Sequence, residues 1–392
     1  MKLAIFVDQV FWRDGGVLST DESYIHFPAS FAEPLGEIVF IGRVAPEPGR
    51  GPYILDRPGI SLCPLPYYPN LYQLWRMHPK NYGLIREMIR DNARTWDAVL
   101  IAGPHPIGQW IVARECIKLG VPVGLIVKQN FIEQMGAHRG LKRVAATIAA
   151  RVLEWDFKRL AKGRIVFTVG MEMANEYGRY SDRVYNHFPC LVDNAQFRMF
   201  SAMSTGADPS RLLCVGRLAP EKGHRYLFEA LAQLNTRGLR CNLDIVGSGP
   251  LEEECRSRVK SLGLESQVTF HGYVPYGPDL FNLYQRAGAM IVSSLTEGLP
   301  QVINESLCIG LPTIATSVGG IPSFLKDGET ALLVPPADVN ALAAAIERLV
   351  HDGRLRESLR RNGRALMENN TLEENRTRFL GGIRRDLFIK HA

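Results

Sequence analysis

Short apolar segments alternate with longer amphipathic segments along the chain, and this alternation constrains the fold more than any other feature. The apolar segments include Leu3–Phe6 and Val123–Val127 in the first half, and Leu212–Val215 and Ala289–Val292 in the second. Strands that are apolar on both faces, with helices between them, are typical of parallel sheets covered on both sides. Because the alternation occurs twice, we predict an α/β protein with two doubly wound domains and ligand sites at the carboxyl ends of their strands.

Further strand candidates follow the same rule. They are Glu37–Ile41, Ala98–Ala102, Ile165–Val169, Asn242–Val246, Val268–His271, Thr313–Ala315 and Ala331–Val334. The segments 186–189 and 205–209 are rich in turn-forming residues and interrupt helical periodicity, so we expect the domain boundary near them. A chain of 392 residues is long enough for two domains of ordinary size.

The composition is that of an ordinary globular protein, with 46% hydrophobic and 22% charged residues. The net charge of +6 fits anionic ligands or an anionic membrane surface, and it equally fits ordinary variation. Seven cysteines lack any Cys-x-x-Cys pair, which favours reduced, buried thiols in a cytoplasmic protein over disulfides or a metal site. We expect neither a signal peptide nor a membrane-spanning helix, because no apolar stretch approaches roughly 20 residues.

The segment 293–305 carries the strongest functional signal. It joins an apolar strand to a predicted helix through Glu297-Gly298-Leu299-Pro300, and Glu305 follows eight positions after Glu297. Amides at the start of a helix bind phosphate oxygens, and carboxylates accept hydrogen bonds from sugar hydroxyls. A ligand that has both groups is a sugar nucleotide.

Together with earlier segments, this pattern resembles the signature of the family-four retaining glycosyltransferases of GT-B fold, whose two glutamates are separated by seven residues. The segment 211–223 resembles the family's first donor-domain strand and basic phosphate loop, and 244–251 resembles the next strand and its turn. The segment 327–338 also fits. The resemblance is strong over residues 211–350 and weak over residues 1–190.

The resemblance implies a GT-B architecture, in which two doubly wound parallel-sheet domains face each other across a cleft. It implies an acceptor-binding domain over residues 1–190 and a nucleotide-sugar donor-binding domain over 191–370. A helix within 371–392 would return to the first domain.

The resemblance also assigns roles to residues of the donor half. Arg217 and Lys222 would bind the donor diphosphate, where fixed cations stabilise the charge that develops on the leaving group. Glu305 would bind the ribose, and Glu297 would face the transferred sugar. The structural alternatives are a solvated basic loop and a pair of helix-capping carboxylates. The donor-binding residues so implied are Gly15, Gly16, Gly216, Arg217, Lys222, Gly247, Tyr273, Glu297, Gly298, Leu299, Gln301 and Glu305.

The acceptor half departs from the family pattern. Gly15 and Gly16 form a turn signal, and in the family such a pair lets the backbone approach the donor phosphate and the acceptor. Many family members end two strands of this domain with histidines. Here His105 is shifted, and Lys128 or Gln129 stands where the second histidine is common. Either His105 or Lys128 is expected to face the ligand, the alternative being that both are polar residues at strand ends.

Residues 133–164 contain eight Arg or Lys residues around an apolar stretch at 144–150. A basic amphipathic helix of this kind can lie on anionic lipid. The alternative, a solvated face on a helix that packs on the core, is the commoner case.

The resemblance implies a retaining, nucleotide-sugar-dependent glycosyltransferase, with Arg217, Lys222, Glu297 and His105 as its catalytic residues. We expect a glycan, lipid-linked or small-molecule acceptor, no nucleic-acid partner, no metal and no other cofactor. We expect a cytoplasmic location, with peripheral contact to the cell membrane left open. The alternatives are an inactive nucleotide-sugar-binding scaffold with the same fold, and a GT-B sugar-nucleotide epimerase, against which the two-glutamate pattern argues.

Overall fold

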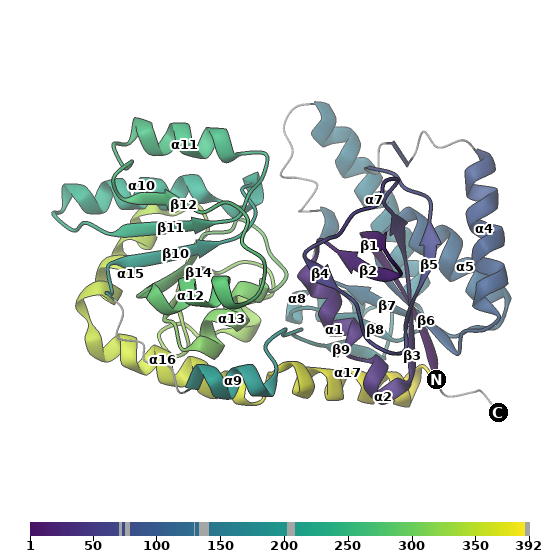
Figure 1. Ribbon diagram of the computed structural model, residues 1–392. Coiled ribbons are helices and arrows are strands. Elements are labelled where there is room, and N and C mark those ends of the chain that lie inside the picture. Colours follow the sequence, from purple (N-terminus) through teal and green to yellow (C-terminus); the bar gives the residue numbers. More distant parts are fainter. Residues whose placement is uncertain (70–72, 75–78, 129, 133–140, 202–207, 389–392) are drawn as a thin grey trace. The chain divides into compact units, whose positions relative to one another are not determined.

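The structure is a computed structural model, and it describes all residues except 70–72, 75–78, 129, 133–140, 202–207 and 389–392 (Figure 1). Contacts within the chain divide it into two units. Unit 1 comprises Met1–Ile132, Ala145–Pro189 and the segment from Asn375 onward, and unit 2 is built mainly from Cys190–Glu374. The limits expected from the sequence are 190/191 and 370/371, one and four residues away.

Unit 1 is built on a nine-stranded sheet whose central strands are parallel, as predicted. β5, β3, β1, β6, β7, β8 and β9 follow one another in parallel across it. The strands are β1 Lys2–Asp14, β2 Val17–Thr20, β3 Glu37–Val44, β4 Tyr53–Ile54, β5 Ile60–Leu65, β6 Ala98–Gly103, β7 Val123–Val127, β8 Val166–Thr168 and β9 Val184–Asn186. The helices are α1 His26–Ala29, α2 Ala32–Leu35, α4 Pro79–Ala93, α5 Ala113–Lys118, α7 Leu141–Ala161, α8 Met171–Tyr177 and α17 Leu372–Asp386.

An antiparallel hairpin extends this parallel sheet. β1 continues well beyond Phe6 to Asp14, and β2 returns beside it, with Asp14 opposite Val17. Gly15 and Gly16 form the turn between them at φ of 53° and 88°, values that favour glycine at both positions of a tight hairpin. The turn predicted at this glycine pair is therefore present, and it directly follows a strand longer than the apolar pattern indicated.

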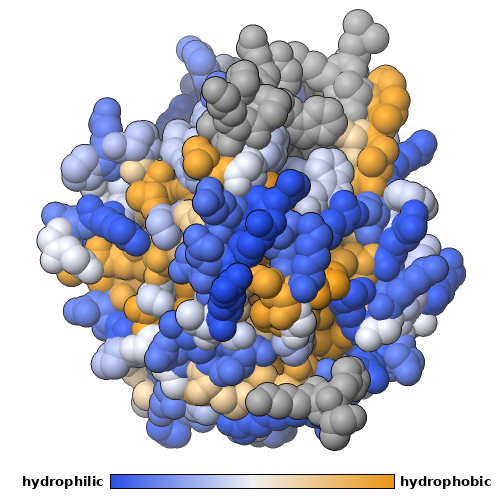
Figure 2. Space-filling model, turned by 90° about the vertical axis from the view of Figure 1, so that its right-hand side faces the viewer, coloured by the Kyte–Doolittle hydropathy of each residue, from blue (hydrophilic) through white to orange (hydrophobic). Residues whose placement is uncertain are grey.

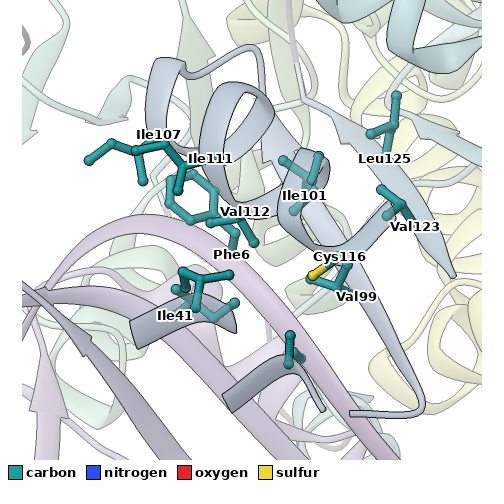
Figure 3. Close-up of a cluster of buried hydrophobic side chains, with 14 of the residues drawn as sticks. Phe6, Ile41, Val99, Ile101, Ile107, Ile111, Val112, Cys116, Val123 and Leu125 are labelled. Carbon is teal, nitrogen blue, oxygen red and sulfur yellow. The ribbon is translucent and has the colours of Figure 1, made fainter. Parts of the chain in front are cut away.

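The core of unit 1 lies between the sheet and the helix that follows β6 (Figure 3). Phe6 and Ile41 from β1 and β3 lie against Ile107 and Ile111, and all four side chains are buried. Residues that were predicted to form all-apolar strands thus supply the sheet side of the core, because each strand buries both of its faces.

The C-terminal segment completes unit 1. Phe379 of α17 stacks on Phe167 of β8 with ring centroids 3.8 Å apart, and it also contacts His187 at 4.9 Å. Burial lowers the pKa of His187 to about 3, so this histidine is neutral and packs as an aromatic ring. These contacts explain why a helix beginning near residue 371 belongs with the first half of the chain.

Unit 2 contains a six-stranded, wholly parallel sheet in the order β12-β11-β10-β13-β14-β15. α10, α11 and α15 cover one face, and α12 and α13 cover the other (Figure 1). The strands are β10 Arg211–Val215, β11 Asn242–Val246, β12 Val268–Phe270, β13 Ala289–Val292, β14 Thr313–Thr316 and β15 Leu332–Val334. The helices are α9 Asn194–Ser201, α10 His224–Thr236, α11 Glu252–Ser261, α12 Pro278–Arg286, α13 Gln301–Ile309, α14 Ile321–Phe324, α15 Val339–His351 and α16 Gly353–Glu368.

All seven cysteines are free and buried, as expected for reduced thiols. Within the described ranges, no helix combines the length and the apolarity that crossing a membrane would require.

Candidate functional site

The parallel register of unit 2 gathers four loops at one edge of its sheet. Val215 at the end of β10 pairs with Val246 at the end of β11, and Val292 at the end of β13 pairs with Ala315 of β14. The loops that follow these strands therefore leave the sheet at the same edge, where open α/β sheets bind ligands.

The loop after β10 is attached to the loop after β13 by backbone contacts. The Leu295 amide donates to the Glu221 carbonyl at 2.7 Å, and the Ser293 hydroxyl donates to the Lys222 carbonyl at 3.1 Å. Gly223 lies at φ 65°, and a Cβ there would stand 2.2 Å from the Ser293 carbonyl oxygen. Only glycine permits this approach, which sets Lys222 beside the loop that carries Glu297.

Lys222 and Glu297 form an ion pair at this junction. The Lys222 ammonium donates to Oε1 of Glu297, and the Ser294 hydroxyl donates to the same oxygen at 2.8 Å. The glutamate side chain is mostly buried, whereas the lysine is more accessible. Because an ammonium has three N–H donors, Lys222 can hold Glu297 and a phosphate oxygen at the same time.

A cavity of about 140 Å³ lies beside this ion pair. Its walls include Gly216, Lys222, Ser294, Glu297 and Gln301, which come from two loops and from the first turn of α13. Pro300 precedes that turn and offers it no side-chain hydrogen bond. A cation and the amino end of a helix therefore border one hollow, an arrangement that suits an anionic group.

The Gly319-Gly320 turn supports Glu297 from behind. A Cβ at Gly319 would stand 1.7 Å from the Glu297 carbonyl oxygen, and the Gly320 amide donates to the Gly298 carbonyl at 2.8 Å. Gly298 and Leu299 are buried here, so the Glu-Gly-Leu-Pro turn is held by close backbone packing on both sides.

Glu305 lies on α13 with its carboxyl group buried. Tyr284 of α12 donates a 2.7 Å hydrogen bond to Oε2 of Glu305, and both side chains are almost inaccessible to solvent. Burial raises the pKa of Glu305 to about 7, while the hydrogen bond from Tyr284 acts in the opposite direction. A carboxyl group that titrates near neutrality is a frequent property of functional sites.

His224 is a cavity residue that sequence reasoning missed. It is the first residue of α10, is buried, and lines the same cavity as Lys222. Burial, followed by the Lys222 charge, lowers its pKa to about 4, so it is neutral at physiological pH. Its position directly after Lys222-Gly223 at a helix start was the available signal.

Four other residues that were predicted for the donor site, Arg217, Gly247, Tyr273 and Glu305, are not among the residues that line this cavity. Arg217 is exposed and pairs with Glu221 on the outer side of the loop. Gly247 packs against the same loop, because a Cβ there would stand 2.0 Å from the Gly216 carbonyl oxygen. Tyr273 follows β12 and is exposed. The structure thus brings Gly216, Lys222, Glu297 and Gln301 to one cavity.

The remaining predicted site residues, Gly15, Gly16 and His105, belong to unit 1. His105 follows β6 and is buried in a polar network, with Nε2 lying 3.4 Å from Oδ2 of Asp8 and 3.3 Å from the Tyr68 hydroxyl. Arg43 joins this network at 3.1 Å from Asp8. These contacts give His105 structural partners, and its catalytic role stays a prediction.

Lys128 follows β7 in unit 1 and is half-buried. Its ammonium lies 3.6 Å from the centroid of the Tyr24 ring, a cation–π contact. Burial lowers the pKa of Lys128, whereas Glu22 and Asp8 raise it. Of the two residues weighed from the sequence, His105 is buried among partners and Lys128 is more accessible.

Comparison with known proteins places these features in a family context. Residues 200–366 match the family described as "Glycosyl transferases group 1". The alpha-D-kanosaminyltransferase of Streptomyces kanamyceticus is 34% identical over 157 residues, which is 40% of this chain and 40% of that protein. The putative colanic acid biosynthesis glycosyltransferase WcaL of Salmonella typhimurium is 30% identical over 170 residues, 41% of each chain. The match therefore spans about two fifths of the length of these curated relatives.

The likeness to solved structures extends over nearly the whole chain. Anabaena HepE, solved in complex with UDP and glucose, superposes with a TM-score of 0.69 at 15% identity, covering 98% of this chain and all of HepE. At this identity the likeness shows the fold alone, and that fold is the GT-B architecture predicted from the sequence.

Proposed function

We propose that this protein moves a hexose-like unit from a nucleoside-diphosphate sugar to an acceptor hydroxyl, because residues 200–366 match the group 1 glycosyl transferases and the chain has the GT-B fold. The observation that carries the proposal is the Lys222–Glu297 pair beside the first turn of α13. It combines a phosphate-binding cation, helix amides and a sugar-binding carboxylate in one place.

The diphosphate is the group for which Lys222, Arg217 and the start of α13 are best suited. Negative charge grows on the diphosphate as its bond to the sugar breaks, so groups already fixed there stabilise the transition state more than the ground state. Lys222 supplies a compact charge, and Arg217 keeps further N–H donors beyond the one that bonds Glu221. Gly216 and the amides near Gln301 complete this part of the proposed site.

The two glutamates would bind the sugar and the ribose. Glu297 already accepts bonds from Lys222 and Ser294 through Oε1, so Oε2 is the oxygen that we assign to a hydroxyl of the transferred sugar. Glu305 has Oε2 bonded to Tyr284, so we assign Oε1 to the ribose hydroxyls. Gly298 and Leu299 hold Glu297 in place, and Gly247 and Tyr273 would border the nucleotide.

We propose that the transfer retains the anomeric configuration. A double displacement needs a carboxylate nucleophile at the anomeric carbon, and the proposal gives Glu297 to a sugar hydroxyl instead. The bond from the anomeric carbon to the diphosphate oxygen breaks first. The acceptor oxygen then bonds to the anomeric carbon on the same face of the sugar. The acceptor proton passes to the departing diphosphate. We assign Gly15 and Gly16 to backbone approach of donor and acceptor, and Lys128 or His105 to contact with the sugar.

We infer the acceptor class from the names of two relatives. WcaL is named for colanic acid biosynthesis and the Streptomyces enzyme for kanosaminyl transfer. We propose an acceptor hydroxyl on a glycan, lipid-linked intermediate or other glycoconjugate, and a cytoplasmic enzyme that needs no metal. The scaffold alternative keeps the donor site and lacks transfer.

A thermal-shift titration tests the donor site first. UDP, GDP, ADP and TDP would be added to the wild type and to Lys222→Met, with Lys326→Met as the control because Lys326 also forms an ion pair in unit 2. A ligand that binds only the folded state at about 100 times its Kd adds about 2.7 kcal/mol of stability. We expect one nucleotide to stabilise the wild type and Lys326→Met equally, and to stabilise Lys222→Met less.

A turnover assay then separates the enzyme from the alternatives. With the matching nucleotide sugar, we expect Arg217→Ala and Lys222→Met to lower kcat far more than they weaken donor binding. Donor binding without transfer or hydrolysis would establish the scaffold instead, and proton NMR of the donor would reveal epimerisation. No stabilisation by any nucleotide would refute the proposed donor site.

A further inference from the structure

Apolar side chains lie between hydrophilic ones on the face of the molecule in Figure 2, as on most protein surfaces. A scattered apolar side chain carries no information, whereas an ordered row on one helix does. α7 carries such a row. Val144, Ile148, Val152 and Trp155 are 56%, 58%, 50% and 58% exposed, and they follow one another at intervals of four, four and three residues.

The opposite side of α7 is fixed to the core of unit 1. Leu153 and Phe157 are buried, and the Leu153 carbonyl accepts a 3.0 Å hydrogen bond from Gln109. A different side of α7 thus already supplies the buried apolar residues that pack on the core. The exposure of the row of four is therefore not explained by a helix that has turned its core-facing side to solvent.

Both acidic residues of α7 in this part of the helix point inward. Glu154 is buried and accepts a 2.8 Å hydrogen bond from Tyr177. Asp156 accepts hydrogen bonds of 2.9 Å from Trp110 and 2.8 Å from Arg114. No negative charge on the described part of α7 is thus left on the outer side.

The charged residues on the outer side of α7 are cations. Arg151 and Arg159 are exposed, and Lys162 follows directly after the helix. The Arg159 guanidinium lies 4.7 Å from the centroid of the Trp155 ring, so cation and aromatic ring form one unit. We call the set Val144, Ile148, Arg151, Val152, Trp155 and Arg159 the outer face of α7.

We propose that the outer face of α7 docks this protein on an anionic lipid bilayer, with the helix lying flat in the headgroup region. An apolar row beside basic residues, with tryptophan at the polar boundary, is the arrangement of interfacial helices. A symmetric second copy would bring the arginines of both copies together, whereas acidic headgroups complement them. From Ile148 onward the outer face of α7 belongs to unit 1, whereas Val144 in the first turn is assigned to unit 2. The inference is independent of the proposed transfer reaction, because none of these residues lines the candidate site.

Vesicle flotation tests the inference with the full-length protein. Vesicles of phosphatidylcholine alone would be compared with an equimolar mixture of phosphatidylcholine and phosphatidylglycerol. We expect binding to the anionic vesicles that weakens as salt is added. Ile148→Gln and Trp155→Gln should each weaken it roughly tenfold, because a buried apolar side chain is lost. Arg151→Gln and Arg159→Gln should each weaken it roughly fivefold.

Leu84→Gln is the matched control, because Leu84 on α4 of the same unit is 62% exposed and lies outside the outer face of α7. It should bind vesicles as the wild type does. Absence of binding to anionic vesicles, equal binding to both vesicle types, or an equal effect of Leu84→Gln and Ile148→Gln would each overturn the inference. A lipid-free dimer that Ile148→Gln dissociates would overturn it as well, and would assign this face to a second copy.

Discussion

The hydroxyl of Tyr284 donates a 2.7 Å hydrogen bond to Oε2 of Glu305, the carboxyl group that we assign to the donor ribose. Both groups are buried, and burial raises the pKa of Glu305 to about 7. A carboxylate accepts hydrogen bonds from two ribose hydroxyls, whereas its protonated form must donate one. The packing of α12 on α13 therefore sets the charge state of Glu305, on which donor affinity would depend in the proposed function.

Donor binding should strengthen as the pH rises through the pKa of Glu305. A nucleoside-diphosphate sugar is the suitable probe, because its diphosphate has no terminal group that titrates in this range. We expect its affinity to increase between about pH 6 and about pH 8, by at most roughly tenfold per pH unit below the pKa of Glu305. Calorimetric titration across this range measures the effect. Glu305→Gln should bind weakly at every pH, and an equal pH dependence in that variant would assign the effect to another group.

Tyr284→Phe should move this pH dependence upward. The Tyr284 hydrogen bond lowers the pKa of Glu305, so its removal leaves burial unopposed and the pKa rises. The same donor should then require a higher pH for full affinity. Tyr177→Phe is the matched control, because Tyr177 in unit 1 is equally buried and donates 2.8 Å to Glu154. A pH profile that is the same in Tyr284→Phe and in the wild type would show that Tyr284 does not position Glu305.

Glu305→Gln should stabilise the protein at high pH. The pKa of Glu305 is about 7 in the folded state and 4.5 for an ordinary glutamate in the unfolded chain, so the folded state binds more protons between these values. The stabilising contribution of Glu305 is thus full below about pH 4.5 and is lost as the pH rises through 7, by up to about 3 kcal/mol. We expect the melting temperature of Glu305→Gln to exceed that of the wild type at about pH 8 and to equal it at about pH 5. A variant that is less stable at both pH values would contradict this.

The sequence predicted the residues of the candidate site better than the partners that hold them. Lys222 and Glu297 stood in recognisable segments, yet their ion pair spans 75 positions and depends on β10 pairing with β13, an order that apolar runs do not encode. Tyr284 reaches Glu305 only because α12 packs on α13. Such a tertiary contact has no local signature in a single chain.

The strand pattern had a similar limit in unit 1. The run Leu3–Phe6 is wholly apolar and was recognised, but β1 continues through a segment of mixed polarity to Asp14. That extension pairs with β2 in a hairpin and is not buried on both faces. It therefore lacks the all-apolar sequence of the central strands.

Gly319→Ala should disrupt the site far more than its backbone conformation alone explains. Gly319 lies at φ 53° and a Cβ there would stand 1.7 Å from the Glu297 carbonyl oxygen, so the loop that presents Glu297 must shift. Gly238→Ala is the matched control, since Gly238 lies at φ 79° with no neighbour within 4 Å of the added Cβ. Alanine at a left-handed position costs roughly 1–2 kcal/mol in both variants.

We therefore expect both variants to lose some thermal stability, while only Gly319→Ala loses donor binding and turnover. The reason is geometric, because a displaced Glu297 can no longer hold the Lys222 ammonium beside the cavity. Melting curves with and without the donor nucleotide, together with kcat and KM, measure both effects. If Gly319→Ala kept full donor affinity, the close packing of the Gly319-Gly320 turn on Glu297 would contribute to stability alone. Donor binding would then tolerate a shift of Glu297, which contradicts the role proposed for this residue.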